Sequence, residues 1–322
     1  MSRSSGPPPG PLVIGGVEVT PGQRARVEIP VARFVTGEWL SLPVEVIHGG
    51  SPGPRVWLSG AIHGDELDGV EIIREVLSEL NPKKLAGAVL GVPVVNVFGF
   101  VAESRYLPDR RDLNRSFPGK SRGSMAARLA HLFMTEVVER CEVGLDFHCG
   151  SDDRQNHPHV RGNLDDPMVA RLARAFGAPI AVHNKPPKGS LRRAASKEGA
   201  QTLVYEAGEA GRFTEAAIAV GVSGTLRCLA ALGMIRGSSE PDVPVQQARA
   251  THWVRAPRSG ICRIEVPLGA SVKKGQRLGG VFELLGEKDT RIRAGVDGVV
   301  IGRRVNPLVH QGEAVVHLAR PG

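Results

Sequence analysis

The chain has 322 residues, more than one average domain needs, and a formal net charge of +8 at pH 7. Apolar residues make up 41% of it and aromatic residues only 4%, so the predicted core is built from Val, Leu, Ile and Ala. No stretch approaches the roughly 18 consecutive apolar residues of a membrane span, and no basic stripe is interleaved with aromatic residues, so the sequence indicates neither membrane insertion nor nucleic-acid binding.

The first segment, residues 1–11, is rich in Ser, Gly and Pro and is predicted to be a disordered tail. It contains no apolar signal core, which predicts a protein of the cytoplasm. None of the four cysteines forms a C-x-x-C pair, so neither a cysteine zinc cage nor a redox motif is indicated. We expect reduced, mostly buried thiols, of which Cys149 could line a site because it follows His148.

Residues 12–50 have the pattern of short strands separated by Gly and Pro turns. The chain then alternates between two kinds of segment. Apolar runs predict strands over residues 56–62, 88–97, 143–147 and 202–205. Helical spacing predicts helices over residues 70–80, 125–137, 166–177 and 213–232. This alternation predicts an α/β domain over residues 12–240 with a largely buried sheet.

A polar linker rich in Gly, Ser and Pro begins at Arg236. Beyond it, residues 250–322 show short strands and turns without a helical period. The sequence therefore predicts a second, small all-β domain over residues 250–322.

The best candidates for metal ligands are two histidines and a glutamate. His63 and Glu66 lie three residues apart at a predicted strand-to-helix turn, a spacing that can bring an imidazole and a carboxylate to one ion. His148, at the end of a distant strand, is the best third ligand and leaves a fourth position open, as a catalytic zinc requires. Asp146 is expected to form structural hydrogen bonds. His157 and His159 are interpreted as part of a polar strand near the site mouth rather than as a second metal pair.

A loop rich in arginine supplies candidates for binding an anion. Arg115 can pair with a carboxylate through two parallel N–H bonds, and Asn114 can donate a further amide bond. Arg105 could polarise the scissile carbonyl of an amide and stabilise its developing negative charge.

Glu206 is the candidate for proton transfer. It ends the predicted strand before Ala207-Gly208, so its carboxylate should be partly desolvated, and we prefer it over Glu209 for this reason. It would accept a proton from the attacking water and pass it to the departing amine. His63, His148 and Glu206 all follow predicted strands, and ligand sites in open α/β sheets collect at that edge.

These segments resemble the succinylglutamate desuccinylase/aspartoacylase family of zinc carboxypeptidase-like hydrolases. The resemblance covers roughly residues 40–235 and rests on His63-Gly-Asp-Glu66, Arg105-Tyr, Asp112-Leu-Asn-Arg115, Asp146-Phe-His148 and Glu206-Ala-Gly. It implies an α/β/α sandwich and one zinc ion per chain held by His63, Glu66 and His148. It further implies Glu206 as the acid/base, Arg105 at the carbonyl oxygen, and Asn114 with Arg115 at the substrate carboxylate. Members often use another arginine before the catalytic strand, a position where Arg192 and Arg193 both lie.

The C-terminal segment resembles a biotinyl/lipoyl-type barrel-sandwich. Such a carrier domain needs a lysine at a hairpin tip, usually flanked by Met, whereas Lys288 has no Met beside it and is interpreted as an ordinary surface lysine. We therefore expect this domain to shape or cap the active-site mouth, or to form a contact in a homo-oligomer.

The leading hypothesis is a zinc amidohydrolase that removes an acyl group from a small N-acylated amino acid. A metallocarboxypeptidase acting on peptide C-termini would use the same zinc, Arg115 and Glu206. A non-catalytic, metal-dependent binding protein is the third hypothesis, although the proposed ligand set with Glu206 speaks against it.

Overall fold

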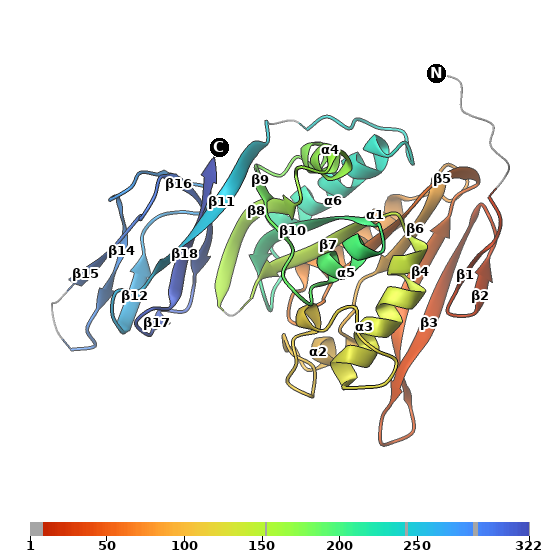
Figure 1. The fold of residues 1–322 in the computed structure, drawn as a ribbon, viewed down its shortest axis with the longest axis horizontal. Helices are drawn as coiled ribbons and strands as arrows, with labels where there is room; N and C mark the ends of the chain where they lie inside the picture. Colours follow the sequence, from red (N-terminus) through yellow and green to blue (C-terminus); the bar gives the residue numbers. More distant parts are fainter. Residues whose placement is uncertain (1–8, 152, 242–243, 286–288, 322) are drawn as a thin grey trace.

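A mixed sheet of 12 strands runs through the molecule, as the computed structural model shows (Figure 1). The structure describes residues 9–151, 153–241, 244–285 and 289–321. Most of the predicted tail (residues 1–8) and Lys288 lie outside the described residues.

The strand order of the large sheet differs widely from the chain order. From one edge to the other the strands are β3 (Gln23–Arg33), β4 (Trp39–His48), β6 (Ala86–Val92), β5 (Ser51–Ser59), β7 (Val143–Gly150), β10 (Gln201–Glu209), β8 (Arg154–Gly162), β9 (Ile180–His183), β11 (Gln246–Arg255), β18 (Ala314–Pro321), β16 (Gly298–Arg304) and β13 (Ser271–Val272). Two smaller sheets consist of β1 (Leu12–Ile14) with β2 (Val17–Val19), and of β15 (Asp289–Arg293), β14 (Arg277–Phe282), β12 (Gly260–Ile264) and β17 (Leu308–Val309).

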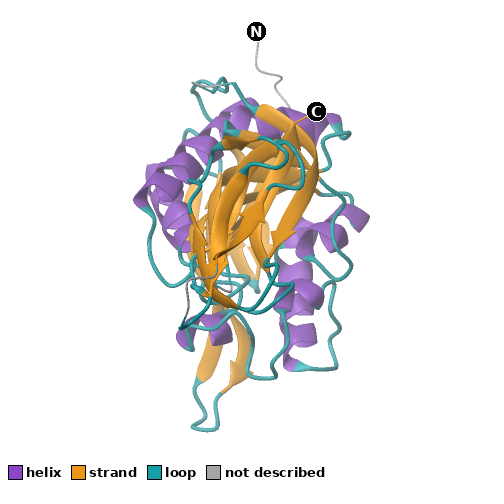
Figure 2. Cartoon of the chain, turned by 90° about the vertical axis from the view of Figure 1, so that its left-hand side faces the viewer, coloured by secondary structure: helices purple, strands orange, loops and turns teal. Residues whose placement is uncertain are grey.

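Helices cover both faces of the sheet, and each face has its own apolar core (Figure 2). One face packs against α1 (Asp68–Glu79), α4 (Pro167–Phe176) and α6 (Glu215–Ala231). The other carries α2 (Val97–Val101), α3 (Met125–Glu136), α5 (Leu191–Lys197) and the short 3-10 helices η1 (Leu113–Arg115) and η2 (Val138–Arg140). The predicted α/β arrangement is confirmed. No helix in the described ranges is long and apolar enough to cross a membrane.

The central strands run parallel, which fixes where the site can form. β5 pairs in parallel with β6 and β7, and β7 pairs in parallel with β10, so their carboxyl ends meet at one edge. Trp57 of β5 is fully buried, and a Cβ atom on Gly144 of β7 would lie 1.9 Å from its ring. Only glycine at position 144 therefore lets these two strands pack around the indole.

Several predicted strands have different ends in the structure: the strand predicted over residues 56–62 stops at Ser59, and the one predicted over residues 143–147 continues to Gly150. The strand predicted over residues 88–97 stops at Val92, because Pro93 has no N–H for the ladder and Asn96 caps α2 by accepting a hydrogen bond from Gly99 N at 2.9 Å. The strand predicted to end before Ala207 continues to Glu209 with a register shift after Glu206. The strand end that favoured Glu206 over Glu209 was therefore predicted wrongly. Glu206 nevertheless lines a cavity at this edge of the sheet, and Glu209 does not.

The last part of the chain, residues 246–321, is the C-terminal β region. Its strands β11, β16 and β18 join β8 and β9 into a closed ring, in which each strand pairs with the next and β16 pairs back onto β8. Six buried apolar side chains from four of these strands form a small separate core: Ile180, Val182, Ala248, Val299, Ile301 and Ala319. We call this five-stranded ring the junction barrel. The predicted domain division and the likeness to a biotinyl/lipoyl-type barrel stay predictions.

Candidate metal and catalytic site

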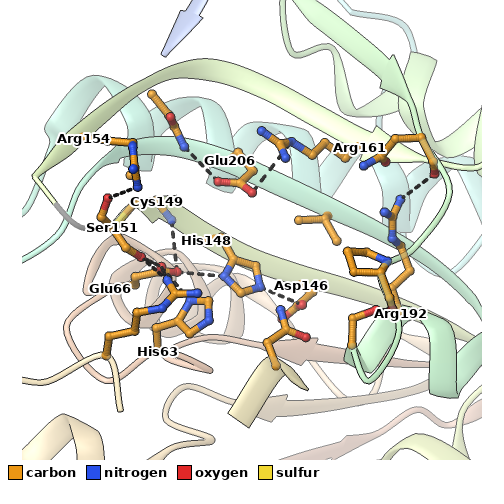
Figure 3. A pocket seen from close by; sticks show the side chains of 18 of the residues that line it. His63, Glu66, Asp146, His148, Cys149, Ser151, Arg154, Arg161, Arg192 and Glu206 are labelled. Atoms are coloured by element: carbon orange, nitrogen blue, oxygen red, sulfur yellow. Dashed lines mark hydrogen bonds and ion pairs between the residues drawn. The ribbon is translucent and has the colours of Figure 1, made fainter. Parts of the chain in front are cut away.

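A cavity of about 260 Å³ lies at the edge where β5, β7 and β10 end (Figure 3). All seven residues that the sequence singled out line it: His63, Glu66, Arg105, Asn114, Arg115, His148 and Glu206. The fold thus brings side chains from four separate segments of the chain to one cavity.

Three of these residues converge on one point. Glu66 lies between the two imidazoles, with its Oε1 2.7 Å from His63 Nδ1 and its Oε2 2.8 Å from His148 Nδ1. One ligand atom from each residue lies within 4.8 Å of the other two, and all three side chains are buried. Two imidazole nitrogens and one carboxylate are a donor set that could hold a metal ion and leave a position open.

Close backbone packing makes this convergence possible. A Cβ atom on Gly64 would lie only 2.0 Å from the carbonyl carbon of Gly99, so the turn after β5 can approach α2 only with glycine there. This approach holds the turn that carries His63, while Glu66 is placed two residues before α1 begins at Asp68.

Further side chains fix the orientation of His148. Its Nε2 lies 2.9 Å from Asp146 Oδ2, and Asp146 Oδ1 accepts a hydrogen bond from Ser59 Oγ at 2.7 Å. Asp146 and His148 lie on the same face of β7, and the structural hydrogen-bonding role preferred for Asp146 from the sequence agrees with these contacts. A carboxylate behind a histidine in this way sets its tautomer and raises its basicity toward a metal.

The electrostatics of Glu66 and His148 follow from their contacts. Burial by itself would raise the pKa of Glu66, but the imidazoles of His63 and His148 outweigh it and hold that pKa well below its ordinary value. Burial opposes a charge on His148 too, yet Asp146 and Glu66 raise its pKa well above the ordinary value. Since a metal binds the deprotonated imidazole, a cation at this point would compete with protons.

Arg105 reaches the same point from the loop after α2. Its Nη1 donates to Ser151 Oγ at 2.7 Å, and its Nη2 donates to Asp112 Oδ2 at 2.8 Å. Ser151 in turn donates to Glu66. Ser151 was not predicted from the sequence, because a single serine after a strand carries no recognisable pattern.

Asn114 and Arg115 are held by the short helix η1. Asp112 caps it by accepting a hydrogen bond from Asn114 N at 2.7 Å. The Oδ1 atom of Asn114 accepts from Leu191 N at 2.9 Å, so its amide NH₂ is the group that Asn114 can offer to a ligand.

Glu206 lies across the cavity from the three converging residues (Figure 3). Asn156 Nδ2 donates to its Oε2 at 2.9 Å, and Arg161 Nε lies 3.8 Å from its Oε1. Glu209 does not line the cavity and forms an ion pair with Arg212 at 3.0 Å instead.

The histidine pair on β8 supports this side of the cavity. The Nδ1 atom of His159 lies 2.7 Å from the carbonyl oxygen of His157, which makes Nδ1 the donor and leaves Nε2 to accept from Arg161 Nε at 3.0 Å. Burial, then the charge of Arg161, lowers the pKa of His159 well below its ordinary value, so the ring is neutral. His159 is thus an anchor for Arg161.

The structure separates the two arginines that the sequence left open. Arg192 lines the cavity and is only 7% exposed, whereas Arg193 points to solvent. Burial, and then the charge of Arg161, lowers the pKa of Arg192 to about 10. No carboxylate of the described residues forms an ion pair with Arg192, and its guanidinium donates to the carbonyl oxygen of Asn184 at 3.4 Å.

The chain is similar to proteins of known family, in sequence and in fold. The family model of the succinylglutamate desuccinylase/aspartoacylase catalytic domain matches residues 52–232. The N-alpha-acetyl-L-2,4-diaminobutyric acid deacetylase of Halomonas elongata is 30% identical over 292 residues, which cover 86% of this chain and 85% of that protein.

Solved structures agree in fold. A succinylglutamate desuccinylase/aspartoacylase from Rhodobacter sphaeroides has a TM-score of 0.84 at 25% identity, with 93% of this chain and 96% of that chain covered. The product-bound ectoine utilization protein EutE of Ruegeria pomeroyi has a TM-score of 0.83 at 25% identity, with 92% of this chain and 94% of that chain covered.

Proposed function

Because the chain belongs to the succinylglutamate desuccinylase/aspartoacylase family, we propose that it is a zinc-dependent amidohydrolase that removes the acyl group from an N-acylated amino acid. The observation that carries the proposal is the convergence of His63, Glu66 and His148 in the same cavity as Glu206. The name of the Halomonas relative, a deacetylase of an acetylated amino acid, supports the same reaction class.

The residues at the convergence point fit zinc. His63 and His148 would supply imidazole nitrogens and Glu66 a carboxylate, while Asp146 keeps His148 in the required tautomer. When bound, zinc lowers the pKa of a water molecule and polarises a carbonyl oxygen.

Glu206 moves the proton. Its carboxylate is held by Asn156, so one oxygen is fixed and the other faces the cavity beside Arg161. Glu206 accepts the proton of the attacking water and returns it to the nitrogen of the departing amine, which must leave protonated. Arg105 stabilises the negative charge that develops on the carbonyl oxygen.

Three cationic or amide groups bind the carboxylate of the substrate. Asn114 and Arg115 come from η1, and Arg192 adds a buried guanidinium without an ion-pair partner among the described residues. A buried charge is unfavourable unless it is paired, so the substrate carboxylate is its natural partner. Such groups hold the amino acid in one orientation with its amide toward Glu206.

The size of the cavity favours a small substrate over a peptide. Its volume is about 260 Å³, and Trp253 and His317 of the C-terminal β region form part of its wall. A metallocarboxypeptidase would need a groove for the residues that precede the C-terminal one. The proposed enzyme is therefore a deacylase of small molecules.

The test combines metal analysis with a deacylation screen of N-acetyl and N-succinyl amino acids beside a short peptide. We expect close to one zinc per chain and cleavage of acyl amino acids in preference to the peptide. Glu206→Gln should keep the metal and lose about 100-fold or more in kcat, because the proton has no acceptor. Glu209→Gln is the matched control, since Glu209 lies on the same strand outside the cavity. Near-normal rates for Glu206→Gln would refute its role.

A further inference from the structure

The strand that carries Glu206 is irregular directly after this residue. Glu206 of β10 pairs with His148 of β7 on one side and with His159 of β8 on the other, and in both ladders the register shifts across Ala207. Irregularities of this kind often lie next to active sites, where they redirect a side chain. Regular strand pairing therefore does not by itself fix residues 207–214, which we call the post-Glu206 segment.

Asp68, the first residue of α1, contacts this segment at two points. The residue is only 2% exposed. A Cβ atom on Gly208 would lie 2.1 Å from Asp68 Oδ2, so the carboxylate fills the space that a side chain at position 208 would need. Gly208 has a φ of +73°, which glycine adopts readily. Asp68 Oδ1 accepts a hydrogen bond from Thr214 N at 2.8 Å. One carboxylate thus contacts the post-Glu206 segment near both of its ends.

The turn before α1 holds the same segment through the backbone. Gly211 N donates a hydrogen bond to the carbonyl oxygen of Asp65 at 2.8 Å. Asp65 directly precedes Glu66, one of the three proposed metal ligands. The turn that carries Glu66 and the segment that follows Glu206 are therefore joined twice, by the Asp65 carbonyl and by the Asp68 side chain.

We propose that Asp68 is a positioning residue that fixes Glu206 relative to the metal ligands. This inference rests on the proposed deacylase function and deepens it. Asp68 does not line the cavity, so it acts on Glu206 through the backbone at Gly208 and not on the substrate. Proton transfer requires the carboxylate within hydrogen-bond reach, and a displacement of about 1 Å can cost about 100-fold in rate.

The first experiment measures steady-state kinetics and zinc content. Asp68→Ala removes both contacts, so kcat should fall about 10- to 100-fold while KM and zinc content stay near the wild-type values. Asp68→Asn should keep kcat within about threefold of the wild type, because its amide oxygen still accepts from Thr214 N and its side chain fills the same space. The matched control is Glu71→Ala, which removes the other acidic side chain from the first turn of α1 and should leave kcat unchanged.

The second experiment approaches the same contact from the other side. Gly208→Ala places a methyl group against the Asp68 carboxylate and should lower kcat to a similar extent. In the double variant Asp68→Ala/Gly208→Ala the methyl group has more room. The combined loss should therefore not exceed that of the larger single variant, whereas two independent defects would multiply.

The third experiment needs no turnover. Arg212 lies within the post-Glu206 segment and its side chain is 71% exposed, so trypsin can cleave after it when the segment loosens. Asp68→Ala should be cleaved there about tenfold faster than the wild type or more, because a hydrogen bond to a charged group is lost, and Asp68→Asn at about the wild-type rate.

Three kinetic results would overturn the proposal: a wild-type kcat in Asp68→Ala, an Asp68→Asn variant as slow as Asp68→Ala, or losses that multiply in the double variant. If Asp68→Ala does not fold, a wild-type kcat in Gly208→Ala would overturn it as well. Equal tryptic cleavage of the wild type and Asp68→Ala would refute the tether even in a protein that hydrolyses no acyl amino acid, so a failure of the tether is separable from a failure of the proposed reaction.

Discussion

The two walls of the cavity are built in opposite ways. The metal-side wall consists of His63, Glu66, His148 and Asp146, which lie in turns and strand ends between residues 63 and 148 and bond to one another. The barrel-side wall consists of Asn156, Arg161, Trp253 and His317, which the pairing of β8, β11, β16 and β18 brings together. Short motifs build the first wall, whereas long-range strand register builds the second.

The two walls also differ in how their polar groups are hydrogen-bonded. In the metal-side wall Glu66 joins His63 to His148 and Asp146 supports His148, while the buried Nε2 of His63 has no hydrogen-bond partner among the described residues and lies 3.3 Å from Asp112 Oδ1. In the barrel-side wall the buried Nε2 of His317 has no hydrogen-bond partner among the described residues, and Arg161 donates to His159 and lies 3.8 Å from Glu206. We therefore expect the first wall to hold the metal and the second to position Glu206 for proton transfer.

The largest effect is expected for a change within the metal-side wall. His148→Ala removes one of the three proposed ligands and leaves Glu66 buried beside a single imidazole. Zinc content should fall from near one per chain to near zero, and activity should fall with it. Plasma mass spectrometry of the purified protein checks this, with the exposed His310→Ala as control. Full metal occupancy in His148→Ala would contradict the ligand assignment.

A smaller effect on zinc binding is expected for Asp146, which contacts the proposed ligand His148. Asp146→Ala leaves the three proposed ligands in place but removes the acceptor for His148 Nε2 and for Ser59 Oγ. The affinity for zinc should drop about 10- to 100-fold, as it does when such supporting carboxylates are removed. Competition with a chelator of known affinity measures the change. Unaltered zinc affinity would show that Asp146 does not support His148 as a metal ligand.

In the barrel-side wall, the buried His317 should make the stability of the protein depend on pH. The pKa of His317 is about 3 in the folded protein and 6.5 is its ordinary value. Between these values the unfolded chain binds a proton that the folded chain does not, so stability is lost as pH falls below 6.5, at about 1.4 kcal/mol per pH unit.

His317→Gln removes this titration. From pH 7 to pH 5 the free energy of unfolding of the variant should fall less than that of the wild type, by about 2 kcal/mol. Urea unfolding of both zinc-saturated proteins at the two pH values measures the difference, and the other titrating groups cancel in the comparison. Identical acid sensitivity of the two proteins would contradict the buried, neutral state of His317.

The smallest effect is expected for Asn156, whose side chain orients the proposed acid/base Glu206. Asn156→Ala removes the hydrogen bond to Glu206 Oε2 and leaves Arg161 in place. We expect kcat to fall about tenfold while KM and zinc content stay unchanged, because Asn156 orients the acid/base without touching substrate. Gln155→Ala, the preceding residue on β8, is the control. A change in KM alone would place Asn156 in substrate binding instead.

The metal-side wall could be predicted largely from the sequence. His63 and Glu66 share one strand-to-helix turn, and His148 ends an apolar strand, so local pattern and the rule for parallel sheets were sufficient to place them on one edge. The α/β order followed from strand and helix periodicity, and the helix predicted over residues 166–177 matches α4 with its caps, Asp166 and Gly177.

The barrel-side wall could not be predicted in the same way. Trp253 and His317 are neighbours only through the register of β11 and β18, and no local pattern specifies which residues of two distant strands become partners. The return of β16 onto β8 depends on the same long-range pairing. Arg192 was distinguished from Arg193 only by the direction that α5 takes after its Ser190 cap. Such features are decided by tertiary packing rather than by local preference.

The proposed reaction depends most on a single zinc ion held by His63, Glu66 and His148. Anomalous diffraction from crystals of the zinc-loaded protein, recorded on both sides of the zinc absorption edge, tests this directly. We expect one strong peak per chain between the imidazoles of His63 and His148 and the Glu66 carboxylate. A fully active protein whose zinc peak lies elsewhere, or that shows no peak between these three residues, would contradict it.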